Sequence, residues 1–145
     1  MSPPPVETFN PDSHPTFSPT YSHISRVPLS PNSTLITFAG QVGHDPTTNT
    51  TGATLGEQCS IAYANVDRCL AAAGARKEDI VGVRHYVVDL LRGGKGPDPE
   101  RAKRYTEWLG ELRPPATLLG VQALAAEALV YEIEVVCVVR EGASD

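Results

Sequence analysis

The sequence has 145 residues, of which 41% are hydrophobic and 20% charged, and its formal net charge is −5. A chain of this length and composition is expected to form one folded domain. Its 12 Lys and Arg residues are scattered, which argues against nucleic acid as a partner, because nucleic-acid surfaces are normally basic. No segment approaches the roughly 20 apolar residues of a membrane span, and the N-terminus lacks the features of a secretory signal. We therefore expect a cytoplasmic protein with no membrane partner.

The composition divides the chain into three parts. Residues 1–20 hold six of the 13 prolines and few large aliphatic residues, which predicts a flexible N-terminal arm or an extended strap. Residues 21–140 form the expected domain, and residues 141–145 are a short C-terminal tail.

The first half of the domain begins with two predicted strands. Residues 22–29 could form the first, and Asn32 and Ser33 supply a turn. Residues 34–40 are rich in β-branched and aromatic side chains, which favours a second strand. The polar segment HDPTTNTTGA that follows contains Pro, Asn and Gly residues that break regular structure, so we expect a loop.

A helix is predicted over residues 54–73. Thr54 and Glu57 have the spacing of a capping box, in which each side chain satisfies a backbone N–H of the other residue. Gly74 stands where a left-handed C-terminal cap is expected. Apolar residues recur at intervals of three and four and form one stripe: Leu55, Cys59, Ala62, Val66, Cys69, Leu70 and Ala73.

The second half predicts a strand, a helix and two closing strands. The strand covers residues 80–89, and a Gly-rich loop follows. Asp98 is the expected N-cap of the helix, with Pro99 in its first position. Its predicted buried stripe is Ala102, Tyr105, Trp108, Leu109 and Leu112. The closing strands cover residues 117–121 and 130–139.

This order of elements predicts an α+β fold with both helices on one face of a sheet. The last strand has two different faces. Tyr131, Ile133, Val135, Cys137 and Val139 alternate with Glu132, Glu134, Val136 and Val138. Because two helices cover only one face, the valines of the second face predict burial against another subunit, and thus a homo-oligomer.

Several segments together resemble the Rid family, also called YjgF, UK114 or L-PSP endoribonuclease-like. They are TYSHI, LITFAGQVGHDPTT, NVDRCLAAAGARKEDIVGVRHYVVDL, RPPATLLGVQALA and VYEIEVVCVV, in an order and spacing that extend from Tyr21 to Val139. The resemblance implies a chorismate-mutase-like fold, assembled as a homotrimer around a central β-barrel with ligand clefts between subunits. It also implies hydrolysis of small reactive enamines and imines to ammonia and a keto acid, without a cofactor.

The resemblance also implies site residues. Tyr21 matches the family's cleft tyrosine, Gly40 the glycine whose backbone approaches the ligand, and Glu132 the glutamate associated with the attacking water. In the family motif R-P-x-R-T, the second arginine pairs with the substrate carboxylate. The corresponding residue here is Ala116, followed by Thr117, so the resemblance implies a divergent member without the motif arginine.

Two roles stay open for the charged residues near these positions. Arg113 could replace the motif arginine, or could face solvent at the helix end. Glu132 and Glu134 lie on one strand face about 7 Å apart. Their proximity could raise one pKa and give a poised catalytic base, or both could be solvated at a strand end.

The histidines and cysteines predict no metal site. Among His14, His23, His44 and His85, no pair has the helical spacing of metal ligands. His23 or His44 could act as an acid or base, but polar surface roles are more common. The cysteines lack metal-type spacing, and we expect reduced thiols packed as small hydrophobic groups.

Three functions compete. The first is a small-molecule enzyme that acts on an imine, an enamine or a related tautomerisable substrate, with specificity altered because Ala116 replaces the arginine. The second is a non-catalytic trimer that binds a metabolite or partner protein. The third is endoribonuclease activity, which the acidic composition disfavours.

Overall fold

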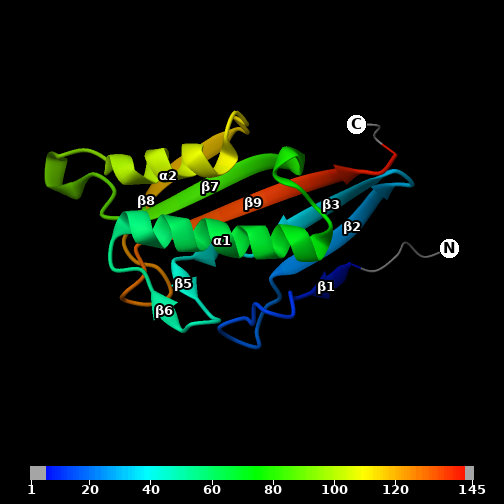
Figure 1. The fold of residues 1–145 in the computed structure, drawn as a ribbon, viewed down its shortest axis with the longest axis horizontal. Helices are drawn as coiled ribbons and strands as arrows, with labels where there is room; N and C mark the ends of the chain where they lie inside the picture. The colour runs from blue at the N-terminus through cyan, green and yellow to red at the C-terminus, as the bar shows by residue number, and fades with distance from the viewer. Residues whose placement is uncertain (1–5, 143–145) are drawn as a thin grey trace.

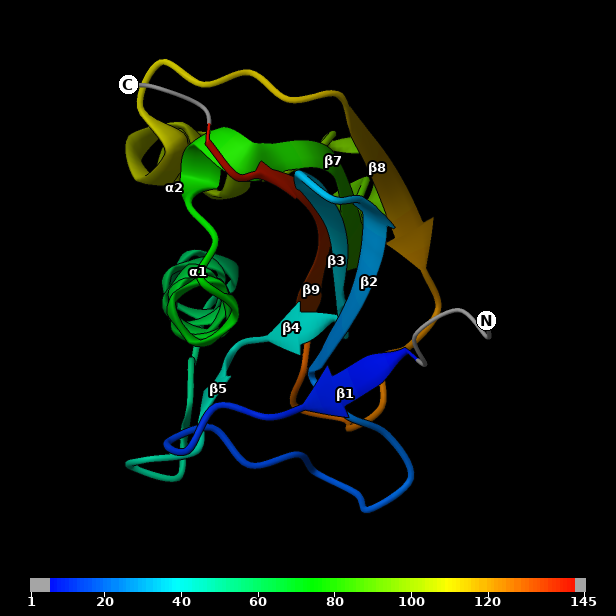
Figure 2. The same cartoon turned by 90° about the vertical axis from the view of Figure 1, so that its right-hand side faces the viewer.

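The computed structural model describes residues 6–142, whose main feature is a strongly curved sheet (Figures 1 and 2). Its strands follow the order β1-β2-β3-β9-β7-β8, and β4 also pairs with β9. Only β7 and β8 pair in parallel. The strands of this sheet are β1 (Glu7–Phe9), β2 (Ile24–Ser30), β3 (Ser33–Phe38), β4 (Gln41–Val42), β7 (Ile80–Val88), β8 (Ala116–Val121) and β9 (Tyr131–Arg140).

Both long helices cover the same face of this sheet. They are α1 (Leu55–Ala73) and α2 (Pro99–Leu109), and two short 3₁₀ turns, η1 (Lys77–Asp79) and η2 (Arg92–Gly94), precede β7 and α2. Figure 2 shows α1 and α2 on one side of the sheet, and no helix covers the other side within residues 6–142. The predicted α+β class with two helices on one face is confirmed. Neither helix in this part of the chain is long and apolar enough to cross a membrane.

The caps of α1 follow the sequence closely. The Thr54 hydroxyl accepts a hydrogen bond from the Glu57 N–H at 3.1 Å. The Glu57 carboxylate accepts from the N–H of Ala53 rather than that of Thr54, so the box closes one residue earlier than expected. Gly74 ends the helix with φ 71°, the left-handed conformation that glycine adopts without a steric cost.

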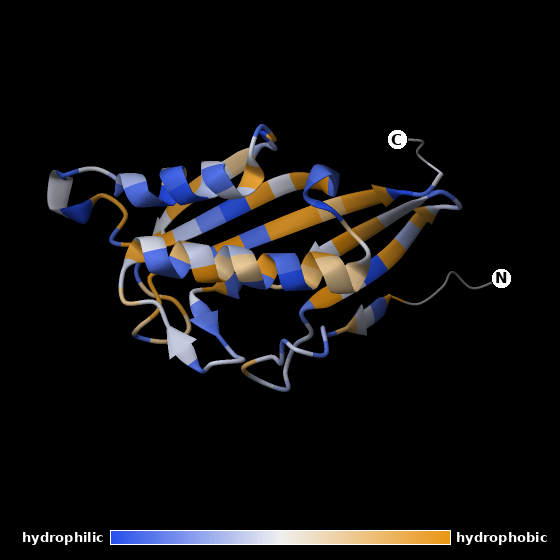
Figure 3. Cartoon of the chain, viewed as in Figure 1, coloured by the Kyte–Doolittle hydropathy of each residue, from blue (hydrophilic) through white to orange (hydrophobic). Residues whose placement is uncertain are grey.

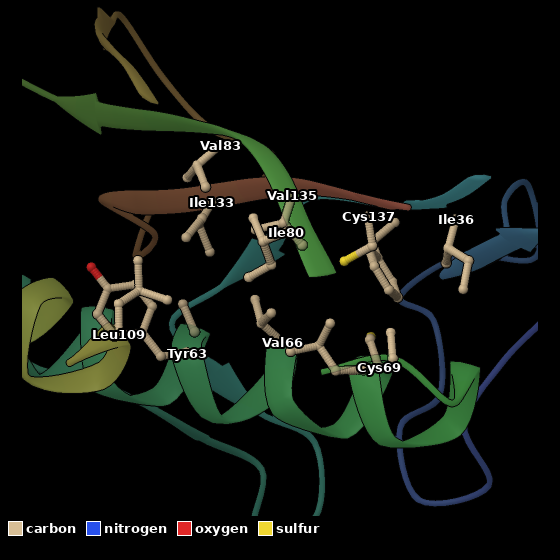
Figure 4. Packing of buried hydrophobic residues seen from close by; sticks show 14 of the residues in the cluster. Ile36, Tyr63, Val66, Cys69, Ile80, Val83, Leu109, Ile133, Val135 and Cys137 are labelled. Atoms are coloured by element: carbon tan, nitrogen blue, oxygen red, sulfur yellow. The ribbon is translucent and has the colours of Figure 1, made fainter. Parts of the chain in front are cut away.

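Strand β9 separates the core from the uncovered face. Tyr131, Ile133, Val135 and Cys137 are at most 1% exposed, whereas the residues between them are half-buried. Figure 4 shows Ile133, Val135 and Cys137 pointing toward Tyr63, Val66 and Cys69 of α1. Figure 3 shows the corresponding hydrophobic bands along the central strands and α1. The predicted two-faced strand is therefore confirmed.

Three expectations need correction. The segment predicted as an irregular loop contains a short hairpin of β5 (His44–Asp45) and β6 (Thr50–Thr51). Ala102, predicted in the buried stripe of the second helix, is exposed, and Leu109 is the fully buried residue of α2. This fits the largely hydrophilic colour of α2 in Figure 3.

The third correction concerns the arm predicted over residues 1–20. From residue 6 onward the extended strap describes it better than a flexible arm, because β1 extends the sheet beside β2 and His14 is only 4% exposed, although most of these residues are exposed. Residues 1–5 and 143–145, which belong to the predicted arm and tail, lie outside the described residues.

A buried histidine lies between the sheet and the helices. His85 Nδ1 is 2.6 Å from the Tyr131 hydroxyl, which donates to the Tyr63 hydroxyl at 3.0 Å. The Tyr105 ring contacts the His85 ring edge-to-face with a centroid distance of 4.6 Å. Burial lowers the pKa of His85 to about 3, so the imidazole is neutral in the folded protein.

We predict that His85 makes the protein less stable in mild acid. Below the ordinary histidine pKa of about 6.5 the unfolded chain binds a proton that the folded protein does not, so stability falls as pH decreases toward 3. For one proton the slope is up to about 1.4 kcal/mol per pH unit. Urea unfolding at pH 7, 6 and 5 should show a shallower slope for His85→Phe. Tyr131→Phe, which keeps the histidine, should retain the steep slope, and equal slopes in all three proteins would contradict the prediction.

Candidate functional site

Three of the residues expected in the site line one hollow. Tyr21, Gly40 and Glu132 belong to separate segments and surround a space of about 410 Å³. Tyr21 precedes β2, Gly40 lies between β3 and β4, and Glu132 is in β9. The other lining residues are mostly small or apolar: Phe17, Ser18, Ala39, Val42, Ala125, Ala126 and Leu129.

Glu132 is the charged group of this first hollow. Burial raises the pKa of the Glu132 carboxyl, and the nearby Glu134 carboxylate raises it further. Within residues 6–142 the Glu132 side chain has no ion pair and no hydrogen bond. Such a carboxylate is suited to accept a proton from a bound water.

Glu134 has a different environment on the same sheet face. The Tyr86 hydroxyl donates to Glu134 Oε1 at 2.9 Å, and Arg84 Nη1 approaches the same oxygen at 3.4 Å. Two neighbouring carboxyls are thus distinguished by their partners: Glu134 is paired and Glu132 is free. This division favours Glu132 as the residue available for a ligand.

Gly40 provides the room that the Glu132 carboxyl occupies. A Cβ at residue 40 would lie only 2.6 Å from Glu132 Cδ and 2.9 Å from Glu132 Cγ. Any larger residue at this position must displace the glutamate side chain. The group next to the Gly40 backbone in the structure is thus Glu132, and the approach of a ligand to Gly40 stays a prediction.

Ala116 and Thr117 line a second hollow, of about 260 Å³, on β8. Arg84 and Glu134 line it too. In register, Thr117 lies opposite Arg84, and Arg84 lies opposite Glu134. Within a single chain the residues expected in one site thus fall into two hollows, with Glu132 and Glu134 between them on β9.

Arg113 lies outside both hollows. Its side chain is exposed, and Nη1 donates to the backbone carbonyls of Gly110 at 2.6 Å and Leu112 at 2.8 Å. These carbonyls follow the last turn of α2, where a cation is favourable. The contacts support the helix-end interpretation of Arg113 rather than its predicted role as a substitute for the arginine.

Two histidines form a buried latch behind the first hollow. The ring of His14 stacks on that of His23 at 4.2 Å, and Gln41 bridges them, with Oε1 2.6 Å from His14 Nε2 and Nε2 3.0 Å from His23 Nδ1. His23 Nε2 is 3.2 Å from the Pro15 carbonyl, and Tyr21 packs edge-on against the His23 ring. This His14–Gln41–His23 latch fixes the segment that carries Tyr21 to the domain.

The latch was not apparent from the sequence, because its members are distant along the chain. Burial lowers the pKa of both His14 and His23, which favours the neutral, hydrogen-bonded rings. His23 is therefore occupied structurally rather than free as an acid or base. His44 is hydrogen-bonded to Thr51 at 2.8 Å and does not line the first hollow.

His14, His23 and Cys69 also bring possible metal-ligand atoms within 4.8 Å of one another. Their geometry does not suit a shared ion. The histidine rings are stacked with an interplanar angle of 20°, so their in-plane lone pairs cannot converge on one metal. Burial also raises the pKa of the Cys69 thiol to about 12, which opposes formation of a thiolate.

The arrangement can be compared with known proteins. The model of the family described as Endoribonuclease L-PSP matches residues 14–139. A RutC family protein of Aquifex aeolicus is 31% identical over 103 residues, which cover 70% of this chain and 78% of that protein. The chain belongs to the L-PSP family, the Rid or YjgF/UK114 group. The predicted family assignment is confirmed.

Solved structures of family members show the same fold. A YjgF/YER057c/UK114 family member of Mycobacterium tuberculosis is 26% identical and has a TM-score of 0.71, with 92% of this chain and 98% of that chain covered. RidA of an Antarctic Psychrobacter species is 25% identical with a TM-score of 0.73, covering 90% and 98% of the two chains. The family match begins at His14, so the latch histidines both fall within the family domain.

We predict that Gly40→Ala moves Glu132 with little effect on the fold. The clash involves only the end of a flexible side chain, so the carboxyl can swing into solvent. The pKa of Glu132 should then fall toward its ordinary value, because the displaced carboxylate is better hydrated. Carboxyl NMR titration measures this shift. Gly82→Ala is the matched control because its Cβ would enter open space. An unchanged Glu132 titration in Gly40→Ala would refute the assignment.

Proposed function

We propose that this protein is a cofactor-independent enzyme that hydrolyses an imine, an enamine or a related tautomerisable substrate in the first hollow. The observation that supports the proposal is the placement of an unpaired Glu132 carboxyl, with a raised pKa, in the hollow shared with Tyr21 and Gly40. These residues are also the ones that the family resemblance assigns to ligand binding and water activation.

The chemistry requires one base and one water. Glu132 accepts a proton from a water molecule as the water oxygen attacks the imine carbon, which gives a carbinolamine. The protonated Glu132 then donates the proton to the amine nitrogen. The C–N bond then breaks as Glu132 accepts the proton of the carbinolamine hydroxyl, so that ammonia leaves and a carbonyl product remains. No step consumes a cofactor.

Ala116 lines the second hollow rather than the first, so it alters the substrate range in this proposal because the proposed trimer joins the second hollow of one subunit to the first hollow of its neighbour. An alanine side chain offers no charge and no hydrogen bond to a substrate carboxylate, and Arg113 donates to the end of α2 instead. The proposed enzyme therefore differs in specificity from deaminases of 2-imino acids. A trimer that only binds a metabolite or partner is the alternative that the activity test separates.

We predict that Ala116→Arg increases ammonia release from freshly generated 2-iminopropionate by at least about tenfold, because a guanidinium can pair with the carboxylate. Ala116→Gln, of similar reach but uncharged, should remain close to the natural protein. Glu132→Gln in the Ala116→Arg background should lower the rate by roughly 10²–10⁴-fold. Failure of every variant on both this substrate and uncharged imines would favour the binding-only alternative.

We also propose that the chain works as a homotrimer, with the hollows opening into clefts between subunits. The sheet face opposite the helices supports this proposal. Val27, Leu35 and Val138 lie side by side in register across β2, β3 and β9, and Val136 follows on the same face. A continuous apolar surface of this kind is normally covered by another protein surface.

We predict that light scattering gives three times the 15.5-kDa mass of the chain. Val138→Glu should reduce the measured mass about threefold, because it introduces a charge into the apolar face. Leu91→Glu is the control, since Leu91 is exposed in the segment between β7 and α2. A monomeric natural protein would overturn the trimer, and so would an unaffected Val138→Glu variant.

A further inference from the structure

Within one subunit, the first hollow contains the carboxyl of Glu132 and no positively charged side chain. Glu132 is its titratable acid, and none of the residues that line it is Lys, Arg or His. The nearest cation on the same sheet face is Arg84, which lies opposite Glu134 in register and is paired with it at 3.4 Å. The Tyr86 hydroxyl strengthens that pairing by donating to the same oxygen. Glu132 is therefore left available to a positively charged ligand.

Two aromatic rings stand at the opening of this hollow. Phe17 is 65% exposed and Tyr21 is 37% exposed, although both are large side chains that would normally be covered. The Phe17 N–H donates to the Tyr21 hydroxyl at 3.2 Å, so a local turn holds the two residues together. The His14–Gln41–His23 latch anchors the segment on which both lie.

The faces of aromatic rings and a carboxylate both attract cations. The negative face of a ring attracts a cation, with a free energy of about 0.5–2 kcal/mol, and a carboxylate attracts it more strongly when both are partly removed from water. The remaining wall, formed by residues such as Ala39, Val42 and Leu129, is apolar. An anionic ligand would meet repulsion from Glu132 and no positively charged side chain, since the hydroxyls of Ser18 and Tyr21 are the neutral side-chain donors in this lining.

We propose that the first hollow selects an organic cation with a short apolar or aromatic body, a primary ammonium or a protonated imine, over a carboxylate. The inference rests on the proposed function in assigning the hollow as the reaction site, and it adds the charge of the substrate. The reacting form is then R₂C=NH₂⁺, which with one water gives R₂C=O and NH₄⁺. The family's usual preference for an anionic substrate is reversed in this chain.

Calorimetry with three ligands of matched shape tests the proposal without requiring turnover. Benzylamine, benzyl alcohol and benzoate carry a cation, a neutral group and an anion on the same ring. At pH 7.5 and low salt, the natural full-length protein should bind benzylamine at least about tenfold more tightly than benzyl alcohol, and should bind benzoate more weakly than either. Higher salt should weaken benzylamine binding and leave benzyl alcohol binding unchanged.

Variants identify the groups responsible. Glu132→Gln should remove the preference for benzylamine over benzyl alcohol. Glu134→Gln is the matched control and should retain it, because Glu134 does not line the first hollow. Phe17→Ala should weaken benzylamine binding several-fold. Benzoate binding as tight as that of benzylamine would overturn the proposal, as would an undiminished preference in Glu132→Gln.

The binding experiment and the activity experiment test the two proposals independently. If benzylamine binds through Glu132 but no imine is hydrolysed, the cation site is supported and the proposed enzyme activity is refuted. If imines are hydrolysed while benzylamine neither binds nor competes with the imine, the enzyme activity is supported and the cation preference is refuted.

Discussion

The alternation of β9 is the constraint on which the rest of this structure depends. Every second residue from Tyr131 to Cys137 is packed into the core beneath α1. The period of two then forces Glu132 and Glu134 onto the opposite face, together with the valines that follow them. A shift of one residue in register would bury two carboxylates under the helices. The strong burial of the core face thus fixes the position of the catalytic candidate, which contributes little to stability itself.

The long elements and the sides of the sheet are predictable from the sequence because local patterns determine them. Capping residues and a regular apolar stripe define α1, and alternation defines β9. Local sequence patterns do not predict those parts of the structure that depend on contacts between distant segments. The strand β1 exists only because β2 offers it an edge, and the latch of His14, Gln41 and His23 joins residues up to 27 positions apart. A Pro-rich segment carries no local sign of either contact.

The candidate site likewise combines features that the sequence predicted with features that only the structure shows. Tyr21, Gly40 and Glu132 were expected together only through the family resemblance, and a single chain does place them around one hollow. The resemblance assigned the role to Glu132, but the strand pattern alone did not distinguish the two glutamates, because both occupy the same face of one strand. Their difference arises from Arg84 and Tyr86 on β7, which approach Glu134 across the sheet. Phe17 was overlooked because an isolated aromatic residue in a Pro-rich segment has no pattern around it.

The substitution at Ala116 changes more than one contact. The family resemblance implies an arginine at this position that pairs with the substrate carboxylate. Arg84, on the same sheet face, pairs with Glu134, and Glu132 has no ion pair within residues 6–142. A half-buried carboxylate in this state has a raised pKa, as Glu132 does, and its charged form is stabilised most by a cation that enters the hollow. This is why we propose that positive charge is the property that the first hollow, with its unpaired Glu132, recognises best.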